Sequence, residues 1–101
     1  MASPAERLAA LNTTDCLWIY ILRILRDQDM HAYAVRNEIE KRFGFRSGIM
    51  TAYKVLYLLH RDGYVRKATR GRRKVYAITP SGRAELRKAA TFYRGLEKKL
   101  R

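Results

Sequence analysis

Hydrophobic residues recur along the chain at spacings of three and four, a pattern typical of amphipathic helices. The first such stretch begins at Ser3, Pro4 and Glu6, a capping-box pattern of hydroxyl, proline and carboxylate. We expect a short helix from there to about Leu11. The pattern leaves open whether its two leucines, Leu8 and Leu11, pack on the core or on a partner subunit.

A second helix is expected between Thr14, which can serve as its N-cap, and Asp27. Its apolar residues cover more than one face, so this helix should be nearly surrounded by protein and form the centre of the core. The residues on its main apolar face are Leu17, Trp18, Ile21, Leu22 and Leu25. A third helix is expected over Met30–Phe43, with Gly44 as its C-terminal stop.

A fourth helix is predicted from about Gly48 to Arg61, with Ser47 as its N-cap. One side of this helix collects the apolar residues Ile49, Ala52, Leu56 and Leu59. The opposite side collects Met50, Thr51, Lys54, Tyr57, Leu58 and Arg61, with Tyr53 at its margin. This outer side holds no acid before Asp62, and its hydroxyl, aromatic and cationic groups can meet base edges and phosphates. A protein interface is the alternative use of such a face.

Two short segments, 64–69 and 74–79, alternate strand-forming residues and are joined by a loop in which Arg70 and Gly71 offer a turn. Six basic residues and no acid occur from Arg66 to Lys74. A pair of helices followed by a basic hairpin is the winged-helix arrangement, in which the second helix enters the major groove of DNA. We therefore predict a mainly helical α+β fold, with a short helix in residues 1–12 and a winged helix-turn-helix domain in residues 13–79.

The last helix is expected to begin at Thr79 and Pro80, as N-cap and first-turn proline. Its apolar residues step by three and four along 80–101, which is the pattern of a coiled-coil seam. A helix of this length extends roughly 33 Å and is long for so small a body. We predict a dimerisation helix in residues 80–101, although packing back on its own domain is the alternative. The predicted interface residues are Leu86, Ala89, Phe92, Tyr93, Leu96 and Leu100.

Charge is distributed very unevenly along the 101 residues. The formal net charge is +13, yet residues 1–45 hold six basic and six acidic side chains. The whole excess therefore lies in residues 46–101, which carry 16 of the 22 basic and 3 of the 9 acidic side chains. A polyanion is the partner expected for this half, and the hairpin favours double-stranded DNA over an acidic protein or an anionic membrane surface.

Several classes of protein are disfavoured by the sequence. The longest apolar run, Cys16–Leu22, is far shorter than the roughly 20 residues of a membrane span. Residues 1–12 lack the basic start and apolar core of a signal peptide. The single cysteine cannot form an internal disulfide, so we expect a cytoplasmic, nucleoid-associated protein. His31 and His60 have no partners at metal-ligand or catalytic spacing, so we expect no metal, no cofactor and no enzymatic activity.

Several short motifs stand out between Leu17 and Leu86. Met30–Val35 reads Met-His-Ala-Tyr-Ala-Val, Thr51–Tyr53 reads Thr-Ala-Tyr, and Asp62–Val65 reads Asp-Gly-Tyr-Val. They resemble the Leu-His-Gly-Tyr-Glu-Ile, Thr-Leu-Tyr and Asp-Gly-Leu-Val elements of the PadR family of winged-helix repressors. Segments 72–79 and 81–83 are similar to the strand of that family and to the opening of its dimerisation helix.

This resemblance implies a homodimeric transcriptional repressor whose C-terminal helix crosses the other subunit. It also implies an aromatic or other small effector near the dimer interface, where we expect the aromatic residues Trp18, Tyr20, Phe92 and Tyr93. The chain departs from the family at Ala32, Met50 and Lys54, which replace Gly, Gly and Pro, so base preference does not carry over. A DNA- or RNA-binding architectural protein of low specificity is the alternative.

The predicted DNA-contacting residues combine the outer face of the fourth helix and the hairpin with positions carried over from the resemblance. They are Tyr33, Ser47, Met50, Thr51, Tyr53, Lys54, Tyr57, Arg61, Arg70, Arg72, Arg73 and Lys74.

Overall fold

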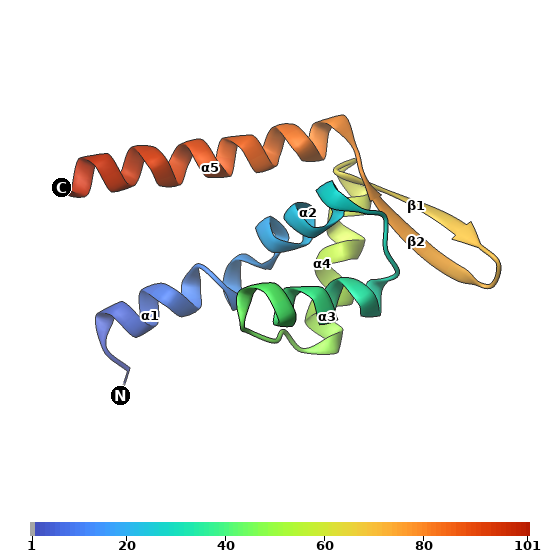
Figure 1. The fold of residues 1–101 in the computed structure, drawn as a ribbon, viewed down its shortest axis with the longest axis horizontal. Coiled ribbons are helices and arrows are strands. Elements are labelled where there is room, and N and C mark those ends of the chain that lie inside the picture. The colour runs from blue at the N-terminus through green and yellow to red at the C-terminus, as the bar shows by residue number, and fades with distance from the viewer. Residues whose placement is uncertain (1) are drawn as a thin grey trace.

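The computed structural model describes residues 2–101 and contains five α-helices and a two-stranded antiparallel sheet in that range (Figure 1). The elements in chain order are α1 (Pro4–Leu11), the 3-10 turn η1 (Thr14–Cys16), α2 (Leu17–Asp27), α3 (Ala32–Phe43), α4 (Ile49–Arg61), β1 (Val65–Arg70), β2 (Arg73–Ile78) and α5 (Pro80–Leu100). The strands form a hairpin that projects from one end of the body, while α1 and the free end of α5 extend from the other. The fold is the winged helix-turn-helix with a long C-terminal helix that the sequence predicts.

Helix α2 is the centre of the core, as predicted. It contacts α3, α4, α5 and β2, and Figure 1 shows it between α5 and α3. Ile21, Leu22, Ile24 and Leu25 are at most 1% exposed because neighbours cover more than one face of the helix. Complete burial of such side chains contributes about 1.5–3 kcal/mol each. The apolar character of this segment is therefore explained by the core.

The same burial bears on a second property of the N-terminal region. By length and composition alone, the stretch Pro4–Asp27 is apolar enough to cross a membrane. The uninterrupted apolar run Cys16–Leu22 is too short to predict such a span. The structure interrupts this stretch with a turn and η1, and it buries α2 among the other helices. The apolar residues of α2 are thus buried in the core of the protein.

Three of the predicted helix ends are confirmed. The Glu6 amide donates to Ser3 Oγ at 3.1 Å, and the Gly82 amide donates to Thr79 Oγ1 at 3.1 Å. Gly44 ends α3 with φ 76°, a left-handed conformation that glycine adopts without a Cβ clash. Ser3 and Thr79 thus supply the side-chain caps of α1 and α5, with proline at the first helical position of each.

Two predicted caps are wrong. Helix α2 begins at Leu17 rather than after Thr14, whose Oγ1 donates back to the Ala10 carbonyl at 3.2 Å. Helix α4 is capped by Gly48, while Ser47 is only 4% exposed and its hydroxyl has no partner within residues 2–101. The reason lies in the preceding loop, because Arg36 Nε donates to the Ser47 carbonyl at 2.7 Å and holds the residue inward.

Two further boundaries differ from the sequence prediction. Helix α3 starts at Ala32, because Met30 pairs with Tyr76 of β2 through backbone hydrogen bonds of 2.8 and 3.1 Å. At the start of α4, Ile49 is 53% exposed instead of facing the core. The bridge at Met30 ties the entry of α3 to the hairpin, a long-range contact that helical periodicity does not reveal.

The hairpin turn lies one residue later than predicted. Strands β1 and β2 pair with Val65 opposite Ile78 and Arg70 opposite Arg73, so Gly71 and Arg72 form the two-residue loop. Gly71 has φ 64°, and among the described residues only glycines have positive φ. A glycine with positive φ at the first loop position is typical of a type II′ turn, whose twist matches that of the strands.

The start of α5 is locked onto the turn that follows α4. The Thr79 hydroxyl donates to the Gly63 carbonyl at 2.7 Å, and the Thr79 amide donates to the Tyr64 carbonyl at 3.1 Å. Gly82 lies so close to this turn that an added Cβ would be 2.2 Å from the Tyr64 carbonyl oxygen. Only glycine fits at this position, so the direction of α5 is fixed relative to the hairpin.

We predict that Gly82→Ala destabilises the protein by about 1–3 kcal/mol, because the methyl group would overlap backbone that cannot move freely. Gly95→Ala on the same helix is the control, since nothing lies within 4 Å of its added Cβ. That variant should gain about 0.5–1 kcal/mol from helix propensity. Urea unfolding followed by circular dichroism measures both changes, and equal shifts of the two variants would contradict the packing argument.

Candidate nucleic-acid interface

The outer face of α4 is exposed and free of acidic residues. Met50 is 80% exposed, Tyr57 62% and Tyr53 48%, and Thr51 and Lys54 are exposed beside them. Exposed apolar and aromatic side chains that lie together in a patch often mark an interaction site. The buried face of α4, formed by Ala52, Leu56 and Leu59, holds the helix on the core and leaves this outer face available.

The basic residues of the hairpin differ in how they are held. Arg70 lies 3.5 Å from Asp29, and Lys74 Nζ donates to Thr69 Oγ1 at 3.0 Å. Arg72 lies at the tip, and no ion pair or side-chain hydrogen bond joins it to any other described residue. Arg72 is therefore free to meet a phosphate, as are Arg66 and Lys67 of β1, which are exposed and equally unpaired among the described residues.

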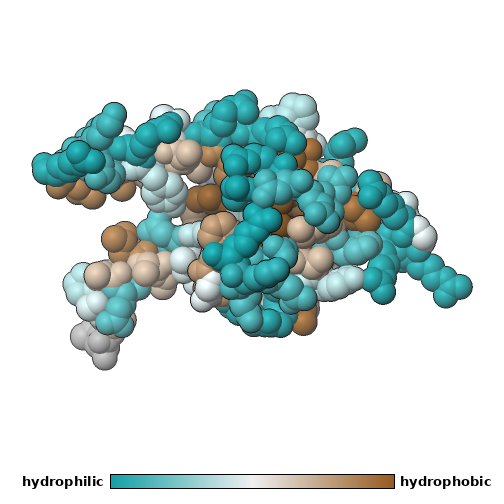
Figure 2. Space-filling model, viewed as in Figure 1, coloured by the Kyte–Doolittle hydropathy of each residue, from teal (hydrophilic) through white to brown (hydrophobic). Residues whose placement is uncertain are grey.

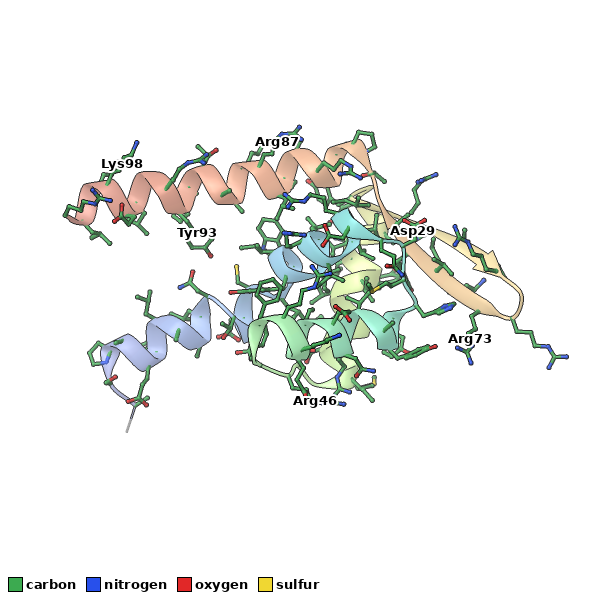
Figure 3. All side chains as sticks on the ribbon, in the orientation of Figure 1. Asp29, Arg46, Arg73, Arg87, Tyr93 and Lys98 are labelled. Atoms are coloured by element: carbon green, nitrogen blue, oxygen red, sulfur yellow. The ribbon has the colours of Figure 1, made fainter. Side chains whose placement is uncertain are left out.

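The turn end of the hairpin is fastened to the start of α3 by aromatic and hydrogen-bond contacts. Arg73 Nη1 donates to the Tyr33 hydroxyl, and its guanidinium lies 5.5 Å from the centre of the Tyr33 ring. The Tyr33 ring stacks on His31 with 5.7 Å between centres and 4° between planes. The structure thus fixes the wing against the helix-turn-helix, and Figure 3 shows Arg73 on the side of the hairpin that faces the body.

His31 is a site residue that the sequence does not single out. Its position before α3 favours a capping or packing role, but it makes no side-chain cap for that helix. Its Nδ1 instead lies 3.0 Å from the Lys74 carbonyl, so that the ring joins α3 to β2. The Met-His-Ala-Tyr motif is the sequence feature that could have identified His31, because it places the imidazole ring two positions before Tyr33.

A hollow of about 420 Å³ lies between the start of α3, the outer face of α4 and β2. Its lining combines phenol, imidazole and cationic groups that can donate to phosphate oxygens. Burial raises the pKa of Tyr76 above its ordinary value, and the nearby Tyr53 adds to the effect. Its hydroxyl therefore stays protonated at neutral pH. The lining residues are His31, Ala32, Tyr33, Tyr53, Arg73, Lys74 and Tyr76.

Eleven of the twelve residues predicted to contact DNA are exposed, and the exception is Ser47. Its side chain is buried, so we remove it from the candidate interface. Arg61 is exposed but bonded to Asp62, whose carboxylate lies 3.0 Å from Arg61 Nε and raises the pKa of the guanidinium. The contacts of the other residues with DNA stay predictions.

The predicted dimer-interface residues of α5 differ in their exposure along the helix. Leu86 and Ala89 are each only 8% exposed because they pack in their own protomer, so the seam prediction is corrected at these positions. Beyond them, Phe92 is 63% and Leu100 76% exposed, and Leu96 39%. Figure 2 shows hydrophobic residues along the free end of α5 and on the side of α1 that faces it.

The predicted effector residues do not lie together. Tyr20 and Tyr93 line a hollow of about 620 Å³ between α2, the end of α3 and α5, and Figure 3 shows Tyr93 pointing from α5 towards this region. Trp18 lines a different hollow of about 330 Å³ with Val55 and Tyr64, and Phe92 lines neither. Burial, and secondarily the adjacent Cys16, raises the pKa of both tyrosines.

An exposed, acid-free helix that follows a second helix and precedes a basic hairpin defines the class: a winged helix-turn-helix protein. The chain belongs to the PadR-like family of transcriptional regulators, whose family model matches residues 21–88. A comparison with curated protein sequences gave no match.

Solved structures with the same fold include a transcriptional regulator from Clostridium thermocellum, with a TM-score of 0.76, 21% identity and coverage of 83% of this chain and 88% of that one. Another is F93 from STIV, a winged-helix DNA-binding protein (TM-score 0.70, 20% identity, 81% and 90% coverage). PadR of Bacillus subtilis, solved in complex with operator DNA, has a TM-score of 0.64 and 24% identity. Here the match covers 74% of this chain and 46% of that protein, and at such identities the likeness establishes the fold.

We predict that Tyr33→Phe loosens the hairpin without unfolding the protein, because the ring remains but the acceptor for Arg73 is removed. Loss of one hydrogen bond should accelerate amide hydrogen exchange in the hairpin about two- to tenfold. Tyr57→Phe is the matched control, since Tyr57 is exposed and its hydroxyl has no hydrogen-bond partner among residues 2–101. Equal exchange rates in the two variants would show that Tyr33 does not hold the wing.

Proposed function

We propose that this protein is a homodimeric, sequence-specific DNA-binding repressor that acts in the cytoplasm on the nucleoid. The observation that carries the proposal is the exposed outer face of α4 together with the basic hairpin, which the Tyr33–Arg73 contact fastens to α3. Membership of the regulator family supports DNA as the ligand. Occupancy of an operator by the dimer would exclude other proteins from that DNA and so repress transcription.

The chemistry of α4 suits the major groove. Thr51 and Lys54 can hydrogen-bond base edges or phosphates, and the Met50 side chain can contact a thymine methyl group. The hairpin cations suit the phosphate backbone or a narrow minor groove. Base selection is thus assigned to α4 and most of the binding strength to the hairpin.

We predict that Arg72→Ala lowers the salt dependence of DNA binding for every sequence. The slope of log K against log salt should fall by about 0.9 for each phosphate that the variant no longer neutralises. Lys99→Ala near the end of α5 removes the same charge far from the hairpin and should leave the slope unchanged. Fluorescence anisotropy at several salt concentrations gives the slopes, and an unaltered slope for Arg72→Ala would refute the wing assignment.

The second candidate is an architectural protein that binds DNA or RNA with low specificity. The observation that favours it is the set of six lysines and arginines on α5, which adds to the eight that the hairpin and α4 supply. Selection from a random duplex pool separates the two functions. A palindromic consensus supports the repressor, and similar recovery of unrelated sequences supports the architectural protein. A changed consensus for Thr51→Ala would assign base reading to α4.

The proposed dimer uses the free half of α5 and the N-terminal helix. Exposed Leu96 and Leu100 on α5, with Leu8 and Leu11 on α1, leave apolar surface at the end of the molecule opposite the wing. A partner's α5 seated on these residues would bury them, and the two wings would then be spaced by paired α5 helices. The open choice for Leu8 and Leu11 is thus resolved in favour of a partner in this proposal.

We predict that Leu96→Lys converts the dimer to a monomer, because the seam would then bury an unpaired charge. Thr91→Lys adds the same charge on another face of α5 and should leave the dimer intact. Light scattering coupled to size-exclusion chromatography distinguishes the two states. A dimer that survives Leu96→Lys would place the interface elsewhere.

An aromatic effector, implied by the family resemblance, is best accommodated by the hollow that Tyr20 and Tyr93 line. Phe43 adds an apolar wall, and Arg42, which is paired with Asp27 and Glu38, lies at the same hollow. The Tyr93 hydroxyl donates to Asn12 Oδ1 at 2.7 Å, so a ligand here would contact the junction of α1 and α5. Ligand binding would thus bear on the proposed dimer surface.

A further inference from the structure

The basic residues of α5 do not lie on the reading face. Helix α2 separates α5 from the α3–α4 pair, and Figure 3 shows Arg87 on the side of α5 that points away from α3. Two helix-to-helix separations amount to roughly 16–20 Å, since packed helix axes lie about 8–10 Å apart. The Debye length is only about 8 Å at physiological salt. DNA seated on α4 would therefore receive little of this charge.

Four arginines from two helices line a groove of about 400 Å³ between α2 and α5. Arg23 and Arg26 come from α2, and Arg83 and Arg87 from α5. The apolar floor is formed by Leu86, which is buried, and by Ala90. Apolar walls lower the local dielectric response and strengthen the field of the surrounding charges.

These cations are poorly neutralised by the protein itself. Arg23 pairs with Asp27 at 2.9 Å, but that carboxylate is shared with Arg42 at 2.7 Å. Within residues 2–101, no ion pair or side-chain hydrogen bond engages Arg26, Arg83 or Arg87. Like charges three and four residues apart on a helix repel each other. A bound anion would relieve this repulsion.

We propose that this groove is a second anion site that binds a ligand with two or more linked phosphate groups. A guanidinium group donates two parallel hydrogen bonds to a phosphate, which suits arginine better than lysine for this task. Arginines on both walls match a ligand whose phosphates bridge α2 and α5. The ligand is a free polyphosphate-bearing molecule or the backbone of a second nucleic-acid segment.

The test compares two charge-matched double variants of the full chain. R83A/R87A removes one wall of the groove, whereas K98A/K99A removes the same charge from the free end of α5. Both pairs are exposed on a helix, where alanine is well tolerated, and thermal melting followed by circular dichroism checks the fold. The probe is sodium tripolyphosphate, titrated calorimetrically at physiological salt in the absence of DNA.

We expect one tripolyphosphate per protomer and a loss of affinity of about tenfold or more in R83A/R87A, with no comparable loss in K98A/K99A. Equal affinities of the two variants, or no binding to the unmodified protein, would overturn the site. Because no DNA is present, failure here is distinct from failure of the repressor proposal.

Anisotropy with a random-sequence duplex then identifies the source of the phosphates. If R83A/R87A binds the duplex as K98A/K99A does, the site takes a free polyphosphate. If R83A/R87A binds it more weakly, and tripolyphosphate displaces duplex from the unmodified protein more than from this variant, the site takes a nucleic-acid backbone. Both results support the site and differ only in the ligand it uses.

Discussion

Burial of the apolar helix α2 sets the positions of the other elements around it. The hydrophobic residues of this helix leave no broad face for solvent, so α3, α4, β2 and α5 must all pack around it. This packing places α4 and α5 against different parts of α2, with the reading face and the long helix in separate layers. The same packing thus buries α2 and separates the outer face of α4 from α5.

The links between the α3 region and the hairpin position the proposed DNA-binding surface on this core. Met30 pairs with Tyr76, and Tyr33 accepts a hydrogen bond from Arg73, so the wing is held against the helix-turn-helix. At the start of α5, Thr79 and Gly82 pack against the Gly63–Tyr64 turn and set the direction of the helix. Short polar contacts therefore add to the burial of Val65, Tyr76, Ile78 and Leu86 in fixing the relative positions of these parts.

The apolar residues of α5 lie in the core in its first half and in solvent in its second half. Its first half buries Leu86 and Ala89 in the protomer, and its second half carries Leu96 and Leu100 into solvent. The remaining faces are rich in arginine and lysine. One helix therefore contributes to the core, supplies the proposed dimer surface and forms a wall of the arginine groove, because successive turns lie at different distances from α2.

The helices, the hairpin, the acid-free face of α4 and the family could all be predicted from the amino-acid sequence, because they depend on periodicity, turn residues and local motifs. The burial of Ser47, the pairing of Met30 with Tyr76 and the packing of Leu86 on its own core could not be predicted in this way. The same holds for the arginines of α2 and α5 that line one groove. A local pattern states which residues share a face, but contacts between distant segments are set by how those faces pack.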